Sequence, residues 1–136
     1  IRKDEIIKKY YAVVTGSLKE KEGTFEDYLL KDSKTNIVTV NSKGKYAKLD
    51  YKVLAEDNNL SLIDINLYTG RSHQIRVQFS SRNYPLYGDQ KYNKKANCGE
   101  QIALYSYFLS FKHPVTKEIL TFSLELPKCY PFNLFS

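Results

Sequence analysis

Cysteine is scarce in this sequence, and long apolar runs are missing from it. Cys98 and Cys129 are the only cysteines, and they lie far apart with no CxxC pattern and no cysteine–histidine cluster. This spacing supports neither a zinc site nor a disulfide scaffold, so we predict no metal, and two isolated thiols fit a reducing cytoplasm. No stretch approaches the roughly 20 apolar residues that span a bilayer, so we expect no membrane partner.

The N-terminus carries neither a methionine nor a charged-then-apolar leader. We therefore expect no secretory signal. Because the first residue is Ile1, we also expect the chain to be processed, truncated or partial.

Apolar and aromatic residues are present in the amounts that one folded domain needs. Of the 136 residues, 42% are hydrophobic and 14% aromatic, with 12 tyrosines and 7 phenylalanines to build a core. Charged residues reach only 26%, which argues against a disordered chain. No repeat, low-complexity segment or linker divides the sequence, so we predict a single domain over residues 1–136.

The net charge of +6 is concentrated in one segment. Residues 71–95 contain six basic residues against Asp89 alone, a net charge of six minus one, or +5. A local basic cluster is the expected footprint of a protein that binds a polyanion such as RNA, although a solvated lysine-rich surface explains charge alone equally well. The basic residues of this segment are Arg71, Arg76, Arg82, Lys91, Lys94 and Lys95.

Alternation of apolar and polar residues predicts a sheet. An Asp57-Asn58-Asn59 turn joins two alternating runs into an antiparallel hairpin, and the last two runs predict a second hairpin. The predicted strands are residues 10–14, 37–40, 46–55, 60–68, 102–111 and 119–126.

Two segments predict helices. A capping-box pattern at residues 24–27 predicts a short helical turn. Ser72 can cap a helix over residues 73–82, with Ile75 and Phe79 on one face. Together with the strands, these segments predict an α+β domain, a mainly antiparallel sheet with one or two helices.

The segment LYTGRSHQIRVQF, residues 67–79, combines a strand end, a glycine turn and a helix start. Arg71, His73, Gln74 and Arg76 fall close together there, and the backbone N–H groups of the helix start add positive potential. Such a site could hold a phosphate or a carboxylate, and it has no obvious nucleophile of its own. Taken singly, His73 and Gln74 are typical of structural hydrogen bonding, and Arg76 of a surface ion pair.

Four motifs in chain order resemble the signatures of RluA-type RNA pseudouridine synthases. TGRSHQIRVQ is similar to the family pattern TGR-[ST]-HQ-[IL]-R-V-H at nine of ten positions, with Gln78 in place of a histidine. KKYYAVVTG resembles the family's K-x-Y-x-A-x-V-x-G strand. YPLYGDQKY resembles HP-[IL]-x-GD-x-x-Y, and IALYSYFLSFKHP resembles the closing strand LHA-x-x-L-x-F-x-HP. Tyr84, Tyr105 and Ser106 replace residues that are usual in the last two motifs.

The resemblance implies the C-terminal part of a pseudouridine synthase catalytic domain. The family isomerises uridine in ribosomal or transfer RNA without a cofactor, after the target nucleotide is flipped out of its stack. By resemblance, Tyr10 stacks on the uracil and Arg76 pairs with the catalytic aspartate. Leu104 falls where the family has an apolar wall of the uracil pocket.

The resemblance also implies a structured RNA partner and a full-length form that is a monomer. It implies packing and RNA-facing roles around the pocket for Arg71, His73 and Gln74. From the charge count we further predict phosphate contacts by Arg82, Lys91, Lys94 and Lys95.

The family's catalytic aspartate lies in an Arg-Leu-Asp motif upstream of the tyrosine strand. None of the seven aspartates of this chain has such a context, so we expect residues 1–136 alone to be inactive. Two other functions stay open. One is a non-catalytic RNA-binding module on the same scaffold. The other is a domain that binds a small molecule or nucleotide phosphate at the helix start, residues 72–76, without salt-dependent affinity for RNA.

Overall fold

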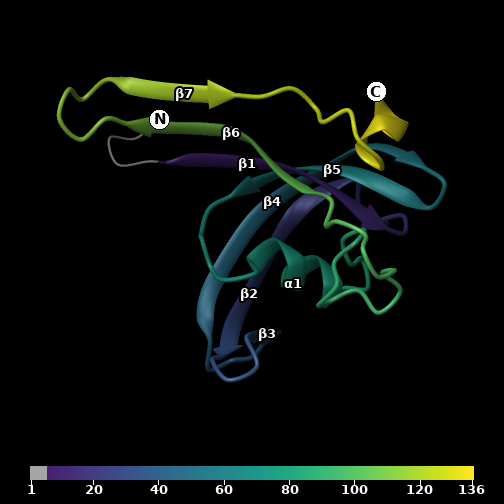
Figure 1. Cartoon of the computed structure of the whole chain (residues 1–136). Helices are drawn as coiled ribbons and strands as arrows, with labels where there is room; N and C mark the ends of the chain where they lie inside the picture. The colour runs from purple at the N-terminus through teal and green to yellow at the C-terminus, as the bar shows by residue number, and fades with distance from the viewer. Residues whose placement is uncertain (1–5) are drawn as a thin grey trace.

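A computed structural model describes residues 6–136, which form a curved antiparallel sheet with an α-helix on its concave side (Figure 1). The strands are β1 (Ile7–Thr15), β2 (Glu22–Asp32), β3 (Ile37–Val40), β4 (Lys45–Asp57), β5 (Leu60–Leu67), β6 (Leu104–Lys112) and β7 (Ile119–Ser123). Their order is β3-β2-β4-β5-β1-β6-β7, and each neighbouring pair is antiparallel. The helix is α1 (Gln74–Ser80), and a 3₁₀ turn, η1 (Phe132–Phe135), lies near the C-terminus. The predicted α+β class is confirmed.

All six predicted strands are present, and both predicted hairpins form. The β4–β5 hairpin turns through Asn58 and Asn59, whose φ angles of 53° and 61° lie in the left-handed region. Asparagine adopts this conformation more readily than most residues with a side chain, which explains the turn.

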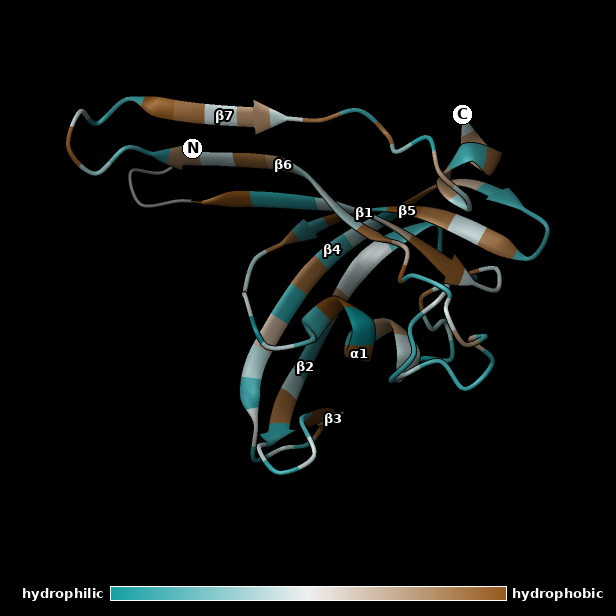
Figure 2. Cartoon of the chain, viewed as in Figure 1, coloured by the Kyte–Doolittle hydropathy of each residue, from teal (hydrophilic) through white to brown (hydrophobic). Residues whose placement is uncertain are grey.

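Strand β1 lies between β5 and β6, and its side chains alternate between the two faces of the sheet. Ala12 is buried on the face that α1 covers, whereas Val13 is buried on the opposite face. Residues two apart on a strand share a face, so Tyr10 lies on the face of Ala12 and Tyr11 lies on the face of Val13. The two neighbouring tyrosines therefore point to opposite sides of the sheet. Figure 2 shows similar alternating hydrophobic and hydrophilic bands along β4.

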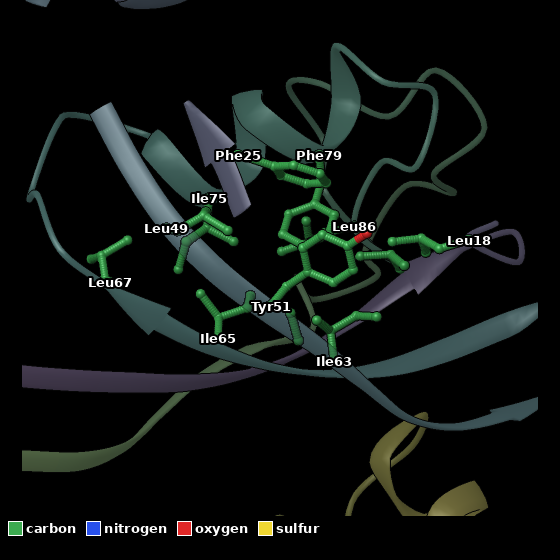
Figure 3. Close-up of a cluster of buried hydrophobic side chains, with 12 residues drawn as sticks. Leu18, Phe25, Leu49, Tyr51, Ile63, Ile65, Leu67, Ile75, Phe79 and Leu86 are labelled. Carbon is green, nitrogen blue, oxygen red and sulfur yellow. The ribbon is translucent and has the colours of Figure 1, made fainter. Parts of the chain in front are cut away.

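The main core lies between α1 and the sheet (Figure 3). Phe79 of α1 is fully buried, and its ring lies edge-on to Phe25 of β2 with 5.0 Å between the centroids. Tyr51 of β4 lies 4.7 Å from the same Phe25 ring. Each aromatic pair of this kind adds about 0.5–1.5 kcal/mol to what area burial contributes. This packing holds α1, and with it the residues at the helix start, over the sheet.

The C-terminal segment covers part of the opposite face of the sheet. Phe132 of η1 is buried in a cluster with Val13, Leu60 and Leu62. Figure 1 draws η1 on the other side of the sheet from α1. The central strands are therefore covered on both faces, and their geometry is held from two sides.

The helical turn predicted at residues 24–27 is wrong, because these residues lie within β2 and pair with β4. Phe25 and Leu29 are buried and four residues apart, a spacing that suits one face of a strand as well as one face of a helix. Thr24 caps nothing; its hydroxyl donates to the Asp50 carboxylate at 2.6 Å.

Helix α1 is shorter than predicted, and Ser72 does not cap it. The N-cap position belongs to His73, which adopts the left-handed conformation with φ 52° and makes no side-chain cap. Asn83 also has a positive φ, 70°, which explains why the helix stops before residue 82. Ile75 and Phe79 face the core, as predicted.

The described part of the chain contains neither a membrane-length helix nor a disulfide. With seven residues, α1 is far too short to cross a bilayer. Cys98 and Cys129 are free and exposed. Residues 6–136 also hold no group of three or more His, Cys, Asp or Glu side chains that could bind a metal ion.

Candidate active site

The side chains predicted for catalysis or for the substrate pocket line one open hollow of about 260 Å³. The hollow lies where the end of β5 and the start of α1 meet β1 and β6, and Leu67 and Ile75 complete its lining. The six predicted residues that the fold brings together here are Tyr10, Arg71, His73, Gln74, Arg76 and Leu104.

Strand pairing positions the aromatic and apolar walls of the hollow. Tyr10 lies opposite Ile65 of β5 and Ser106 of β6, at a register irregularity in the β1–β6 pairing. Leu104 lies opposite Ala12, which is two residues from Tyr10 and on the same face of β1. Tyr10 and Leu104 therefore border the hollow from adjacent strands. Both are partly buried against the main core.

Arg76 is held by a two-point ion pair with Asp89. Its Nε donates to one carboxylate oxygen at 3.0 Å, and its Nη2 donates to the other at 2.9 Å. The guanidinium also lies 5.1 Å from the centre of the Tyr92 ring. Within residues 6–136, no hydrogen bond engages Nη1. A guanidinium fixed along one edge in this way can still present its remaining N–H groups to a second anion.

The Asp89 side chain is fully buried and stays ionised. Burial alone would raise the pKa of this carboxyl, but its hydrogen bonds outweigh that effect and hold the pKa below its ordinary value. The donors are Arg76 and the backbone N–H groups of Tyr92 and Lys91. Asp89 is thus a fixed negative charge beneath the hollow.

His73 forms a second link between the helix start and the following loop. Its Nδ1 lies 2.7 Å from the hydroxyl of Tyr92, which in turn accepts a hydrogen bond from the backbone N–H of Val38. Burial, followed by the positive charges of Arg76 and Lys91, lowers the pKa of His73. The lowered pKa favours the neutral ring at pH 7, and the hydrogen bond with Tyr92 holds the imidazole in place.

Two of these partners were not predicted as site residues. Asp89 and Tyr92 clamp Arg76 and His73, and both belong to the segment YPLYGDQKY. The GD-x-x-Y spacing, which places an acid and an aromatic residue three positions apart, was therefore the sequence pattern that could have identified these two residues. Their contacts with α1 could not be known without the fold.

The Gln74 side chain links the β5–α1 turn to the sheet by hydrogen bonds. Its side-chain oxygen accepts from the Thr69 hydroxyl at 2.8 Å and from the Arg71 N–H at 3.0 Å. Its side-chain nitrogen donates to the Lys48 carbonyl and to Gln78. With 3% of its surface exposed, Gln74 shapes the hollow mainly through this network.

Arg82 has an internal partner of its own. Its guanidinium donates to Asp27 at 2.7 Å and lies 4.0 Å from the centre of the Phe25 ring. Buried Gln78 donates to the same carboxylate at 2.9 Å. The charge of Arg82 is therefore balanced within the fold, and its predicted contact with RNA phosphate stays a prediction.

The three lysines of the basic segment lie outside the hollow. Lys91, Lys94 and Lys95 are exposed, and the ammonium of Lys91 donates to the carbonyl of Asn36 at 2.9 Å. None of the three lines the hollow. Their predicted contacts with phosphate also stay predictions.

No carboxylate is among the described residues that line the hollow. Four aspartates of the described residues are bound to other partners. Asp27 and Asp89 pair with arginines, while tyrosine hydroxyls donate to Asp50 and Asp64. The hollow therefore has an aromatic wall, an apolar wall and the Arg76 guanidinium, and no acidic group from residues 6–136 lines it.

Comparison with known proteins matches this arrangement to one family. The sequence model described as RNA pseudouridylate synthase matches residues 1–81. The chain belongs to the RluA-type family of RNA pseudouridine synthases. An uncharacterized RNA pseudouridine synthase of Bacillus subtilis, YlyB, is 35% identical over 125 residues, which are 90% of this chain and 41% of that protein. Ribosomal large subunit pseudouridine synthase D of Neisseria meningitidis serogroup A is 32% identical over 138 residues, covering 91% of this chain and 37% of that protein.

Two solved structures have the same fold as this chain. The human RNA pseudouridylate synthase domain containing 1 superposes with a TM-score of 0.79 at 22% identity, covering 91% of this chain and 56% of that one. The human domain containing 4 gives a TM-score of 0.74 at 20% identity, with 95% and 61% covered. The chain spans less than half the length of the two curated relatives above.

Proposed function

We propose that residues 1–136 are the C-terminal part of the catalytic domain of an RNA pseudouridine synthase that acts on ribosomal or transfer RNA. The observation that carries this proposal is the hollow in which Tyr10, Arg76 and Leu104 come together. It has the aromatic, cationic and apolar groups that a flipped uracil and a neighbouring carboxylate require.

The reaction needs a carboxylate beside Arg76. The bond from ribose C1′ to uracil N1 breaks, the uracil turns, and a bond from C1′ to C5 forms while the C5 hydrogen is lost and N1 gains one. Tyr10 stacks on the uracil and Leu104 walls its other side. Arg76 presents Nη1 to the incoming carboxylate and keeps it ionised in the partly buried hollow.

The carboxylate comes from outside residues 1–136 in this proposal. The support is that the described lining contains no Asp or Glu, while Asp89, the acid next to Arg76, is buried and already bound at both oxygens. Residues 1–136 alone are therefore expected to bind RNA without converting uridine. No cofactor takes part, and the full-length protein acts as a cytoplasmic monomer.

A non-catalytic RNA-binding module is the second candidate function, and the missing carboxylate is the observation that favours it. The coding sequence upstream of Ile1 separates the two. If it encodes an Arg-Leu-Asp motif, replacing that aspartate by asparagine in the full-length protein should abolish isomerisation and leave RNA binding unchanged. An upstream sequence without such a motif would support the binding module.

A further inference from the structure

A second hollow, of about 380 Å³, adjoins the candidate active site and shares Arg71 with it. Its walls come from the end of β2, the turn before β4 and the turn between β5 and α1. Four cationic side chains line it and no acidic residue does: Lys31, Lys43, Lys45 and Arg71. We call this hollow the basic groove.

Strand register directs the lysines toward the same face of the sheet as the active site. Lys31 follows Leu29 by two residues on β2, and Lys45 lies directly opposite Leu29 on β4. Residues two apart on one strand, and residues directly opposite on neighbouring strands, point to the same side. Leu29 is buried in a cluster with Val77 of α1, so both lysines share the face that α1 covers.

The turn that carries Lys43 is built tightly against β2. A side chain at Gly44 would place its Cβ 2.3 Å from the backbone carbonyl of Leu29, so only glycine fits here. The side-chain oxygen of Asn41 accepts from the Lys43 N–H at 2.9 Å, and the Asn41 carbonyl accepts from the Gly44 N–H at 2.8 Å. The backbone of the turn is therefore fixed.

The positive charge of the basic groove is not balanced by the fold. The ion pairs of residues 6–136 are Lys21–Glu56, Arg76–Asp89 and Arg82–Asp27, and none involves a residue of the groove. Arg71 is anchored by a 2.7 Å hydrogen bond from Nε to the Tyr46 carbonyl, at the boundary between the two hollows. Asp32, next to Lys31 in sequence, does not line the basic groove; its carboxylate accepts the N–H of Lys34, and it lines a third hollow to which Lys31 also contributes.

We propose that the basic groove binds the phosphodiester backbone of RNA immediately next to the flipped nucleotide, with Lys31, Lys43, Lys45 and Arg71 as the phosphate contacts. The inference rests on the proposed function, from which it takes RNA as the partner and the hollow at Tyr10 as the site of the flipped base. Phosphate contacts of this kind set the position and orientation of a nucleic acid without reading its sequence. The groove thus holds the RNA strand on one side of the target nucleotide, so that the base of that nucleotide can enter the hollow at Tyr10.

RNA binding by the purified 136-residue chain tests the groove. The ligand is a fluorescent RNA hairpin with a uridine in its loop, and the salt concentration is varied. In the groove variant, Lys31, Lys43 and Lys45 are replaced by glutamine. The matched control replaces Lys19, Lys117 and Lys128, which are exposed and line neither hollow, so the net charge changes equally.

The expected loss follows from counterion release. Each phosphate contact on a single strand contributes about 0.7 to the slope of log affinity against log salt, so three lost contacts lower the slope by about 2 and the affinity at 0.1 M salt by about 100-fold. The control variant should keep most of the affinity. An equal loss of affinity in both variants, or no loss in the groove variant, would overturn the inference about the groove. RNA binding by the unmodified chain would still support the proposed function in that case.

Lysine footprinting on the unmodified chain gives a readout that does not depend on variants. Bound RNA should slow the acetylation of Lys31, Lys43 and Lys45 several-fold and leave Lys117 and Lys128 unaffected. Equal rates with and without bound RNA would reject the groove. If the unmodified chain shows no salt-dependent RNA binding at all, the proposed function fails together with the groove.

Discussion

Replacing Asp89 by asparagine removes the buried negative charge that holds Arg76. The substitution keeps the shape of the side chain, and its oxygen can still accept the backbone N–H groups of Lys91 and Tyr92. What it removes is the charge that faces the guanidinium at 2.9 and 3.0 Å. Breaking a buried ion pair costs about 3–5 kcal/mol. Because the Arg76 side chain is 23% exposed and can recover some hydration, we expect a loss of about 2–4 kcal/mol.

Urea unfolding of residues 1–136 measures this loss as the change in the free energy of unfolding. A double-mutant cycle with Arg76→Gln isolates the coupling between the two side chains, because removing both partners should cost less than the sum of the single changes. Glu56→Gln is the control. It removes one member of the solvent-exposed Lys21–Glu56 pair and should leave the stability unchanged within error.

The pH dependence supplies an independent check. The pKa of Asp89 is lowered in the folded chain, so this group stabilises the fold above its unfolded pKa of about 3.9 and loses that contribution as the pH falls toward the folded value. The difference between the parent chain and the Asp89→Asn variant should therefore be full at pH 7 and shrink below about pH 4. A variant that unfolds within 0.5 kcal/mol of the parent at pH 7, on the order of the error in such fits, would refute the buried-pair reasoning.

Three further predictions concern the core, the stacking residue and the basic segment. Phe79→Ala should lower the free energy of unfolding in urea by about 3–5 kcal/mol, because the ring is fully buried against the sheet. Tyr10→Ala should weaken binding of a hairpin RNA by about 5- to 100-fold in fluorescence anisotropy, which corresponds to one lost base stack. Replacing Lys94 and Lys95 together by glutamine should reduce the affinity much less than the groove variant does, since neither lysine lines a hollow next to Tyr10. An effect as large as that of the groove variant would place the RNA along the 91–95 loop instead.

The strands could be predicted because alternation at period two is a local property. The exception is β2, where a helical turn was predicted instead of a strand. Phe25 and Leu29 are four residues apart, which is compatible with both a strand and a helix, and residues 24–27 also imitate a capping box. Pairing with β4 decides the outcome, and partners that are distant in sequence cannot be seen in a local pattern.

The local pattern of residues 67–79 grouped four of the eight residues that line the hollow, and the family resemblance added Tyr10 and Leu104. The local charge count was a weaker guide. It included Arg82, whose charge is balanced by Asp27, a residue 55 positions away, and Arg76, which is balanced by Asp89. It also passed over Lys31, Lys43 and Lys45, because acidic residues elsewhere in residues 1–70 offset their charge in the count, and because these lysines reach the site only through the sheet.

The central claim is that residues 1–136 supply the uracil-binding half of a pseudouridine synthase site and lack its carboxylate. The most direct test incubates the purified chain with RNA that carries tritium at C5 of uridine, and measures tritium release and RNA binding in the same samples. The account predicts salt-dependent binding of the RNA and no release of tritium. Release of tritium above the buffer blank would contradict it, because the chain would then contain the catalytic group that its hollow lacks.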